Sequence, residues 1–218
     1  MYDTFHGDRS VNTGEPTDIV LPRATAAVFR VLVGADTSFS IRQLARIAGV
    51  SAPRAVEIVN RASERGLILV EQGGRSRMCR FNREHLAAGA IIELVTIRER
   101  MLHAIEDEIA SWKIAPLHAS FFGSAARGEG DTNSDLDLLL VRPTDEPEED
   151  WEEQKYTSGV RLTAKIGNPV SWFDISMTEL RRSVRASEPI IAQWKKDSIS
   201  LSGPSLPDLL RQMRGKRK

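Results

Sequence analysis

The sequence predicts an α/β protein of the α+β type, in which helices and strands are grouped into separate folded segments. Two observations favour this class. Helical periodicity dominates residues 23–112 and is interrupted by one hairpin pattern, whereas short apolar strands and amphipathic segments follow from residue 113. The chain has 218 residues, of which 41% are hydrophobic. This length suits one large domain or two modest ones with a buried core.

Charge and composition narrow the choice of partners. Lys+Arg and Asp+Glu number 30 each, so net charge alone predicts no partner. Between Leu21 and His85, however, eleven arginines stand against five acids, and this local excess could attract a polyanion. A single cysteine, Cys79, excludes an internal disulfide and fits a reducing compartment. The N-terminus lacks an apolar core and no stretch is long enough to span a bilayer, so we expect a cytoplasmic protein without a membrane partner.

The N-terminal half reads as a flexible arm, residues 1–22, followed by a folded segment at 23–85. Ser40 and Gln43 form a capping-box pattern that begins a short helix. Gly49 permits a tight turn, and Ser51 is placed to cap a second helix with Pro53 in its first turn. The stretches "LILVEQ" and "SRMCRFN" then predict a β-hairpin, in which Cys79 is a small packed residue.

This segment resembles the winged helix-turn-helix domains of small bacterial transcription regulators. The resemblance implies that the helix from Ser51 enters the major groove of DNA. Side chains of this helix would contact bases and backbone, and arginines at the hairpin tip would contact phosphate or the minor groove. The predicted DNA-binding residues are Ser51, Pro53, Arg54, Arg61, Arg75 and Arg77. The alternative is a protein-docking module whose arginines keep it soluble.

A long helix is predicted next, from about Asn82 to Trp112, and residues 86–112 are assigned as a connecting helix. Its apolar stripe runs from Leu86 to Ile109 at three- and four-residue steps. The helix could connect two domains, pack on the second one, or pair with a second copy of the chain. A homodimer through this helix therefore remains open.

Two aspartates mark the candidate site of the second segment, residues 113–203. "LHASFFG" predicts a strand, Gly123 and Ser124 a turn, and "DLDLLLV" a second strand. Asp135 and Asp137 then project to the same side, about 7 Å apart by strand rise. Such a pair is mutually destabilising without a cation. Magnesium prefers oxygen ligands and leaves places for phosphate, so the pattern favours nucleotide chemistry.

A third carboxylate is expected from "PVSWFDIS". Alternation places Trp172 and Asp174 on one face of this strand and Phe173 and Ile175 on the other. An acid in so apolar a context requires an ionic partner, so Asp174 is predicted as the third metal ligand. The alternative is that Asp135 caps a turn, Asp137 is solvated and Asp174 ends an edge strand.

These residues resemble the nucleotidyltransferase superfamily of DNA polymerase β, in particular its minimal bacterial members. The family pattern is Gly-Ser-x-Ala-x-Gly, then Ser-Asp-x-Asp, then a later strand Asp. It is met here by Gly123, Ser124, Ala126, Gly128, Ser134, Asp135, Asp137 and Asp174.

The resemblance implies transfer of a nucleoside monophosphate from an NTP to an acceptor hydroxyl, with two Mg²⁺ ions. Asp135 and Asp137 would hold both ions, and Asp174 would hold the one beside the acceptor. The NTP would be bound by Gly123, Ser124, Arg127 and Ser134. Relatives modify RNA ends, small molecules or partner proteins, and some belong to toxin–antitoxin pairs.

The acceptor is left open, because only a basic tail at 204–218 follows the minimal domain. The enzyme interpretation has two rivals. One is a DNA-binding regulator whose second domain senses a nucleotide, and the other is an antitoxin whose main task is to bind a partner toxin.

Overall fold

The computed structural model describes residues 16–74, 76–130, 134–145 and 148–215, which form two compact units. The first contains residues 16–99, and the second contains the chain from Arg100 onward. Helices and two small sheets make up both units, so the predicted α+β class is confirmed. Within these ranges, no helix has the length and apolar character that crossing a membrane requires.

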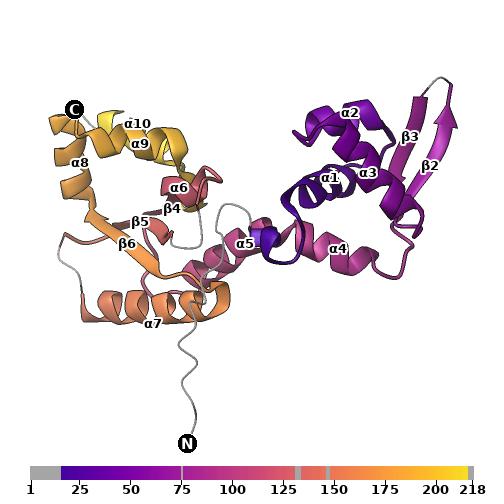
Figure 1. Cartoon of the computed structure of the whole chain (residues 1–218). Coiled ribbons are helices and arrows are strands. Elements are labelled where there is room, and N and C mark those ends of the chain that lie inside the picture. Colours follow the sequence, from indigo (N-terminus) through magenta and orange to yellow (C-terminus); the bar gives the residue numbers. More distant parts are fainter. Residues whose placement is uncertain (1–15, 75, 131–133, 146–147, 216–218) are drawn as a thin grey trace, which may run out of the picture. The chain divides into compact units, whose positions relative to one another are not determined.

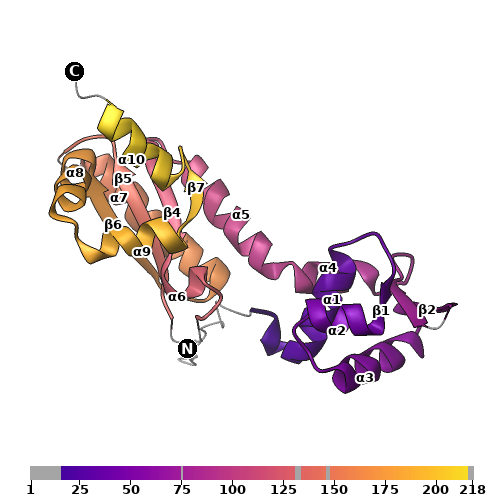
Figure 2. The same cartoon turned by 90° about the horizontal axis from the view of Figure 1, so that it is seen from above.

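The first unit is a small helical bundle with a three-stranded sheet (Figures 1 and 2). Its strands are antiparallel in the order β1-β3-β2. The elements are η1 (Pro16–Ile19), α1 (Arg23–Val33), β1 (Phe39–Ser40), α2 (Ile41–Ile47), α3 (Ala52–Ser63), β2 (Ile68–Gly73), β3 (Ser76–Phe81) and α4 (Ala88–Val95).

The helix starts in this unit follow from local chemistry. Ser40 and Gln43 form both hydrogen bonds of the capping box at the start of α2. Gly49 has φ +66°, a left-handed conformation that suits glycine, and it turns the chain toward α3. The Ser51 side chain caps α3 by accepting from the Arg54 backbone N–H. These elements agree with the sequence-based expectation.

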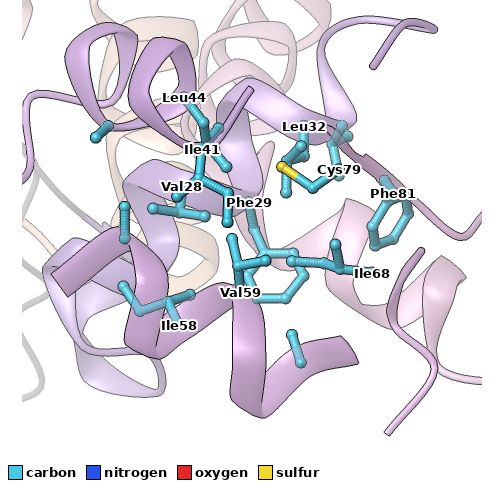
Figure 3. Close-up of a cluster of buried hydrophobic side chains, with 14 of the residues drawn as sticks. Val28, Phe29, Leu32, Ile41, Leu44, Ile58, Val59, Ile68, Cys79 and Phe81 are labelled. Carbon is cyan, nitrogen blue, oxygen red and sulfur yellow. The ribbon is translucent and has the colours of Figure 1, made fainter. Parts of the chain in front are cut away.

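Figure 3 shows the core that holds these helices against the hairpin. Phe29 of α1 and Phe81 of β3 meet edge to face, with ring centroids 6.1 Å apart. Cys79 is fully buried in the same core, and its thiol donates to the Phe39 carbonyl at 3.2 Å. Burial raises the pKa of Cys79 to about 11, against a smaller opposing effect of Arg77. The thiol is therefore an inert packing group, as predicted.

The predicted continuous helix at 86–112 is wrong. The chain forms α4 and α5 (Ile97–Ala110), separated at Thr96, and residues before Ala88 form turns. The Thr96 hydroxyl donates to the Ile92 carbonyl at 2.8 Å, and Thr96 leaves helical dihedral angles with φ −102° and ψ 14°. This competition of a threonine hydroxyl for the backbone is a known way to end a helix. Leu86, assigned to the apolar stripe, is fully exposed.

The second unit is built on a four-stranded mixed sheet of order β6-β5-β4-β7. β4 is antiparallel to both β5 and β7, and β6 is parallel to β5. Beyond α5, the elements are β4 (His118–Phe122), α6 (Gly123–Ala126), β5 (Leu136–Arg142), α7 (Glu149–Ile166), β6 (Val170–Ser176), α8 (Met177–Ala186), α9 (Pro189–Asp197), β7 (Ile199–Ser202) and α10 (Leu206–Gly215).

Helices cover both faces of this sheet (Figure 1). Leu138 and Leu140 of β5 pack toward α5 and α7, whereas Leu139 and Val141 pack toward α8, α9 and α10. β5 is therefore buried on both faces, which explains its unbroken apolar run. Asp137 is the one residue of β5 that is only partly buried. Its side chain lies on the same face of the sheet as Leu139.

Candidate active site

The candidate site begins with Asp135 and Asp137 at the N-terminal end of β5. Asp135 is exposed and Asp137 is half-buried. Burial raises the pKa of Asp137, and the charge of Asp135 raises it further. The two carboxylates therefore lie close enough to repel each other, as the sequence predicted.

The turn at Gly123 lies directly against Asp137. Gly123 has φ +81°, and a Cβ at this position would overlap the Asp137 carboxylate. Phe122, the residue before it, is the cross-strand partner of Asp137. Ser124 follows in α6 and is half-buried. Only glycine allows the turn and the carboxylate to approach this closely.

Ser171 on β6 is the third side chain at this site, and sequence reasoning missed it. It pairs with Asp137 across the parallel strands β5 and β6. Its hydroxyl donates to Asp135 Oδ2 at 2.8 Å. The "PVSWFDIS" pattern contained the signal, because alternation places Ser171 with Phe173 on the face opposite Asp174.

Asp174, the predicted third ligand, is not brought next to Asp135 and Asp137 by the sheet. It pairs with Leu140, three positions beyond Asp137, or about 10 Å along the strand at 3.3 Å per residue. Trp172 and Trp151, its neighbours, belong to the core on the α7 face of the sheet. Asp174 therefore points to the face opposite Asp137.

Three donors already hold the Asp174 carboxylate, which is 12% exposed. Trp151 Nε1 and Lys155 Nζ each donate to Oδ2 at 2.9 Å, and Arg142 Nη1 donates to Oδ1 at 3.1 Å. Burial alone would raise the pKa of Asp174, but the hydrogen bonds from Trp151, Lys155 and Arg142 outweigh burial and lower it. The sequence predicted that Asp174 needs an ionic partner. In the structure, Arg142 and Lys155 are its ionic partners.

Arg127 and Ser134, the other predicted nucleotide-binding residues, form hydrogen bonds with other residues of the same unit. The Arg127 guanidinium donates to Glu129 at 2.7 Å and to Asp197 at 3.2 Å. The Ser134 carbonyl accepts from Asn168 Nδ2 at 3.1 Å. Arg127 would have to exchange an acidic partner for phosphate if it were to bind a nucleotide.

The donor set fits a divalent cation in part. Asp135 and Asp137 supply carboxylate oxygens and Ser171 supplies a hydroxyl, all of which suit Mg²⁺. Within the described ranges, no group of three or more His, Cys, Asp or Glu side chains is positioned to hold a metal. The site therefore offers two carboxylates, and further ligands would come from water and phosphate.

The predicted DNA contacts lie on the first unit. Arg54 is ion-paired with Glu57 at 2.6 Å, and Arg77 Nη2 donates to Asn60 Oδ1 at 2.9 Å, which links the hairpin to α3. Arg61 is exposed. Ser51 serves as the cap of α3, with Pro53 in its first turn. Arg75 lies outside the described residues.

Comparison with solved structures gives distant likenesses. A MarR-family transcriptional regulator from Silicibacter pomeroyi is 25% identical, with a TM-score of 0.32 over 41% of this chain and 66% of that one, just under two thirds. A mutant of the toxin–antitoxin MntA–HpeT is 14% identical, with a TM-score of 0.38 over 52% of this chain and 82% of that one. A toxin–antitoxin with AMP-PNP is 16% identical, with a TM-score of 0.35 over 53% and 82%.

Comparison by sequence gives a firmer result. No curated protein sequence matches the chain. Residues 105–170 match the family model of the nucleotidyltransferase domain, and the matched stretch contains Gly123, Asp135 and Asp137. The second unit thus carries a nucleotidyltransferase-domain match, which supports a nucleotidyl-transfer function.

Proposed function

We propose that the second unit transfers a nucleoside monophosphate from an NTP to an acceptor hydroxyl, with Asp135 and Asp137 binding the divalent cation of the NTP. One observation carries the proposal. Two mutually repelling carboxylates lie beside the Gly123 turn, inside the stretch that matches the nucleotidyltransferase domain. Such a pair is stabilised when a cation binds between its oxygens.

The reaction forms a bond between the acceptor oxygen and the α-phosphorus and breaks the bond from that phosphorus to the bridging oxygen. Pyrophosphate leaves, and the acceptor hydroxyl loses its proton. A bound Mg²⁺ would offset the negative charge of the triphosphate and polarise its oxygens. Asp135 and Asp137 would orient the NTP through that ion, and the missing side chain at Gly123 lets the Asp137 carboxylate lie against the turn. The Ser124 hydroxyl would donate a hydrogen bond to a phosphate oxygen of the NTP.

The direct test is to incubate the full chain and MgCl₂ with each α-labelled NTP and with RNA, a cell extract or the protein alone. We expect label to enter one acceptor class and pyrophosphate to be released. Asp137→Asn should abolish both. Asp36→Asn is the matched control, because Asp36 lies in the first unit and is almost fully exposed. Absence of labelling and of pyrophosphate release with every NTP would refute the proposal.

Ser171 favours a second candidate, a nucleotide sensor that binds NTP without transferring it. Transfer normally uses a carboxylate beside the acceptor hydroxyl, and the side chain nearest to Asp135 on β6 is a hydroxyl instead. Calorimetry of NTP binding alongside single-turnover pyrophosphate release separates the two. A sensor binds the NTP with magnesium and releases no pyrophosphate.

We propose that the first unit binds DNA through α3 and the β2–β3 hairpin. The exposed arginines of this surface support the proposal, since phosphate contacts with arginine release counterions. Arg77→Ala should weaken binding to all sequences and reduce the salt slope by about one unit. Arg54→Ala should instead relax sequence discrimination by about 1–3 kcal/mol if Arg54 leaves Glu57 for a base. If the full chain fails to retard DNA at low salt, this unit is a docking module.

Association with other chains also remains a proposal. The candidate partners are a second copy, through the region of α4 and α5, and a toxin protein. Sedimentation of the full chain at several concentrations tests the first, and co-purification with the product of a neighbouring gene tests the second.

A further inference from the structure

We infer that the active site holds one divalent cation, the one that arrives with the triphosphate, because Ser171 occupies the position from which a third carboxylate would bind a second cation. This inference rests on the proposed NTP binding by Asp135 and Asp137. It differs from the sequence-based expectation of two Mg²⁺ ions, which depended on Asp174.

The register of the sheet identifies Ser171 as the relevant position. Ser171 is the direct neighbour of Asp137 on the adjacent parallel strand, and both side chains lie on the same face. Its hydroxyl reaches Asp135 Oδ2 at 2.8 Å, so a side chain at this position contacts the carboxylate pair. An acid at residue 171 would complete a group of three carboxylates, and the serine does not.

The next residue of β6 on this face, Phe173, has no side-chain oxygen that could bind a cation. Phe173 packs edge to face on Phe122 and Trp194, with ring centroids 6.0 Å and 5.5 Å apart. These aromatic rings form an apolar wall next to the site along β6. They supply no oxygen for a cation.

Among the described residues, Glu129, Asp197 and Asp174 are already paired with cationic side chains. Glu129 and Asp197 both bind the Arg127 guanidinium. Asp174 is held by Arg142 and Lys155 on the opposite face of the sheet. Moving Asp174 would leave two largely buried cations without this partner, which costs several kcal/mol.

The charge balance leads to the same conclusion. A cation bound to the triphosphate gains oxygens from both the NTP and the two aspartates. A second cation would share the same two aspartates and gain only a neutral hydroxyl from Ser171, which already donates its proton to Asp135. Mg²⁺ gives up its water reluctantly, so this ligand set holds a second ion weakly.

The experiment counts bound Mn²⁺ by electron paramagnetic resonance, with a saturating NTP analogue that carries a methylene bridge between the α- and β-phosphates. After the Mn²⁺ bound by free analogue in solution is subtracted, the wild-type chain should hold one ion. Ser171→Asp should bind two, because it restores the third carboxylate. Asp174→Asn is the matched control, because Asp174 lies on the opposite face of the sheet, and it should bind one. Circular dichroism and analogue affinity establish that each variant is folded.

The outcomes separate this inference from the proposed function. Two ions in the wild-type chain would overturn the single-cation inference and leave the proposed NTP binding intact. No bound ion and no bound analogue would overturn both. If Ser171→Asp fails to fold, Ser171→Glu and the wild-type count decide, since a count of one in the wild type supports the inference. A folded Ser171→Asp that still binds one ion would show that residue 171 does not control the count.

Discussion

Two groups of carboxylates on the same strand pair have opposite surroundings. Asp135 and Asp137 face each other and the Ser171 hydroxyl, with the pKa of Asp137 raised by burial and by Asp135. Asp174, three positions further along, is held by Lys155 and Arg142, and its pKa is lowered. The described residues supply no ion pair to the first group, whereas two cationic side chains hold the second.

The difference shows that an aspartate on a strand next to a pair of carboxylates need not join them. Asp174 satisfies its charge inside the protein, and this stabilises the packing of α7 on the sheet. In the proposed function, Asp135 and Asp137 leave their charge to an external cation. The first group would then serve ligand binding, whereas the hydrogen bonds of Asp174 hold the fold together.

The largest expected effect lies at the first group. Asp137→Asn should lower the rate of magnesium-dependent transfer by about four orders of magnitude, or ~5.5 kcal/mol, because the NTP loses its cation-mediated orientation. Its effect on the fold should be small and favourable without metal. Pyrophosphate release under single-turnover conditions measures the rate. If Asp137→Asn keeps wild-type turnover, Asp137 does not serve the transfer reaction and does not differ from Asp174 in function.

Asp174→Ala should show the reverse behaviour. We expect the free energy of unfolding to fall by about 3 kcal/mol, at the low end for a broken buried ion pair. The loss is limited because Arg142 retains Glu179 and Lys155 retains Glu152. Turnover per folded molecule should stay near the wild-type value. Urea unfolding with parallel activity measurements tests this, and a stable but inactive variant would return Asp174 to the catalytic site.

Local sequence signals predicted much of the fold. The capping box at Ser40, the turn at Gly49 and the hairpin around residues 68–81 depend on neighbouring residues, so a linear pattern is sufficient. The long helix failed because apolar periodicity continues across Thr96, and the side-chain bond that ends α4 leaves no trace in that periodicity.

The candidate site was predictable in one half only. Asp135 directly precedes β5 and Asp137 lies in it, so the alternation of extended backbone alone places them on the same side. The third position depends on how β6 aligns with β5. Alternation correctly separated Asp174 from Phe173, but only the pairing of Asp137 with Ser171 shows which face of β6 belongs to the site. The partners of Asp174 come from α7 and β5, and no motif links them.

Gly123→Ala tests the close approach of the turn to the Asp137 carboxylate. Alanine at φ +81° costs about 1–3 kcal/mol in backbone strain, and its methyl group would displace the Asp137 carboxylate. Gly128→Ala is the matched control, because Gly128 has φ +76° and an added Cβ there would meet no described atom within 4 Å. Both variants should lose similar stability, and only Gly123→Ala should weaken binding of magnesium with NTP. Thermal unfolding and calorimetry measure the two effects, and equal loss of affinity in both variants would contradict the placement of Asp137.

The smallest expected effect is an opposite dependence of stability on pH, measured in EDTA. The lowered pKa of Asp174 means that this carboxylate stabilises the fold above its ordinary pKa of 3.8, and that the stabilisation is lost as the pH falls through the lowered value. The raised pKa of Asp137 has the opposite sign. Its folded carboxyl holds the proton more tightly than the unfolded chain does, so stability is lost as the pH rises from 3.8 through the raised value.

Asn variants isolate each contribution, because an amide does not titrate. Asp174→Asn should be less stable than the wild type at pH 7, and the difference should shrink as the pH falls below 3.8. Asp137→Asn should be slightly more stable at pH 7, and its advantage should vanish below the same pH. Urea unfolding at half-unit steps from pH 3 to pH 7 gives both curves. If the two differences have the same sign at pH 7, the carboxylates do not have the opposite surroundings described above. Addition of magnesium with NTP should reverse the sign of the stability difference between Asp137→Asn and the wild type. It should leave the stability difference for Asp174→Asn unchanged, because only Asp137 gains a cation.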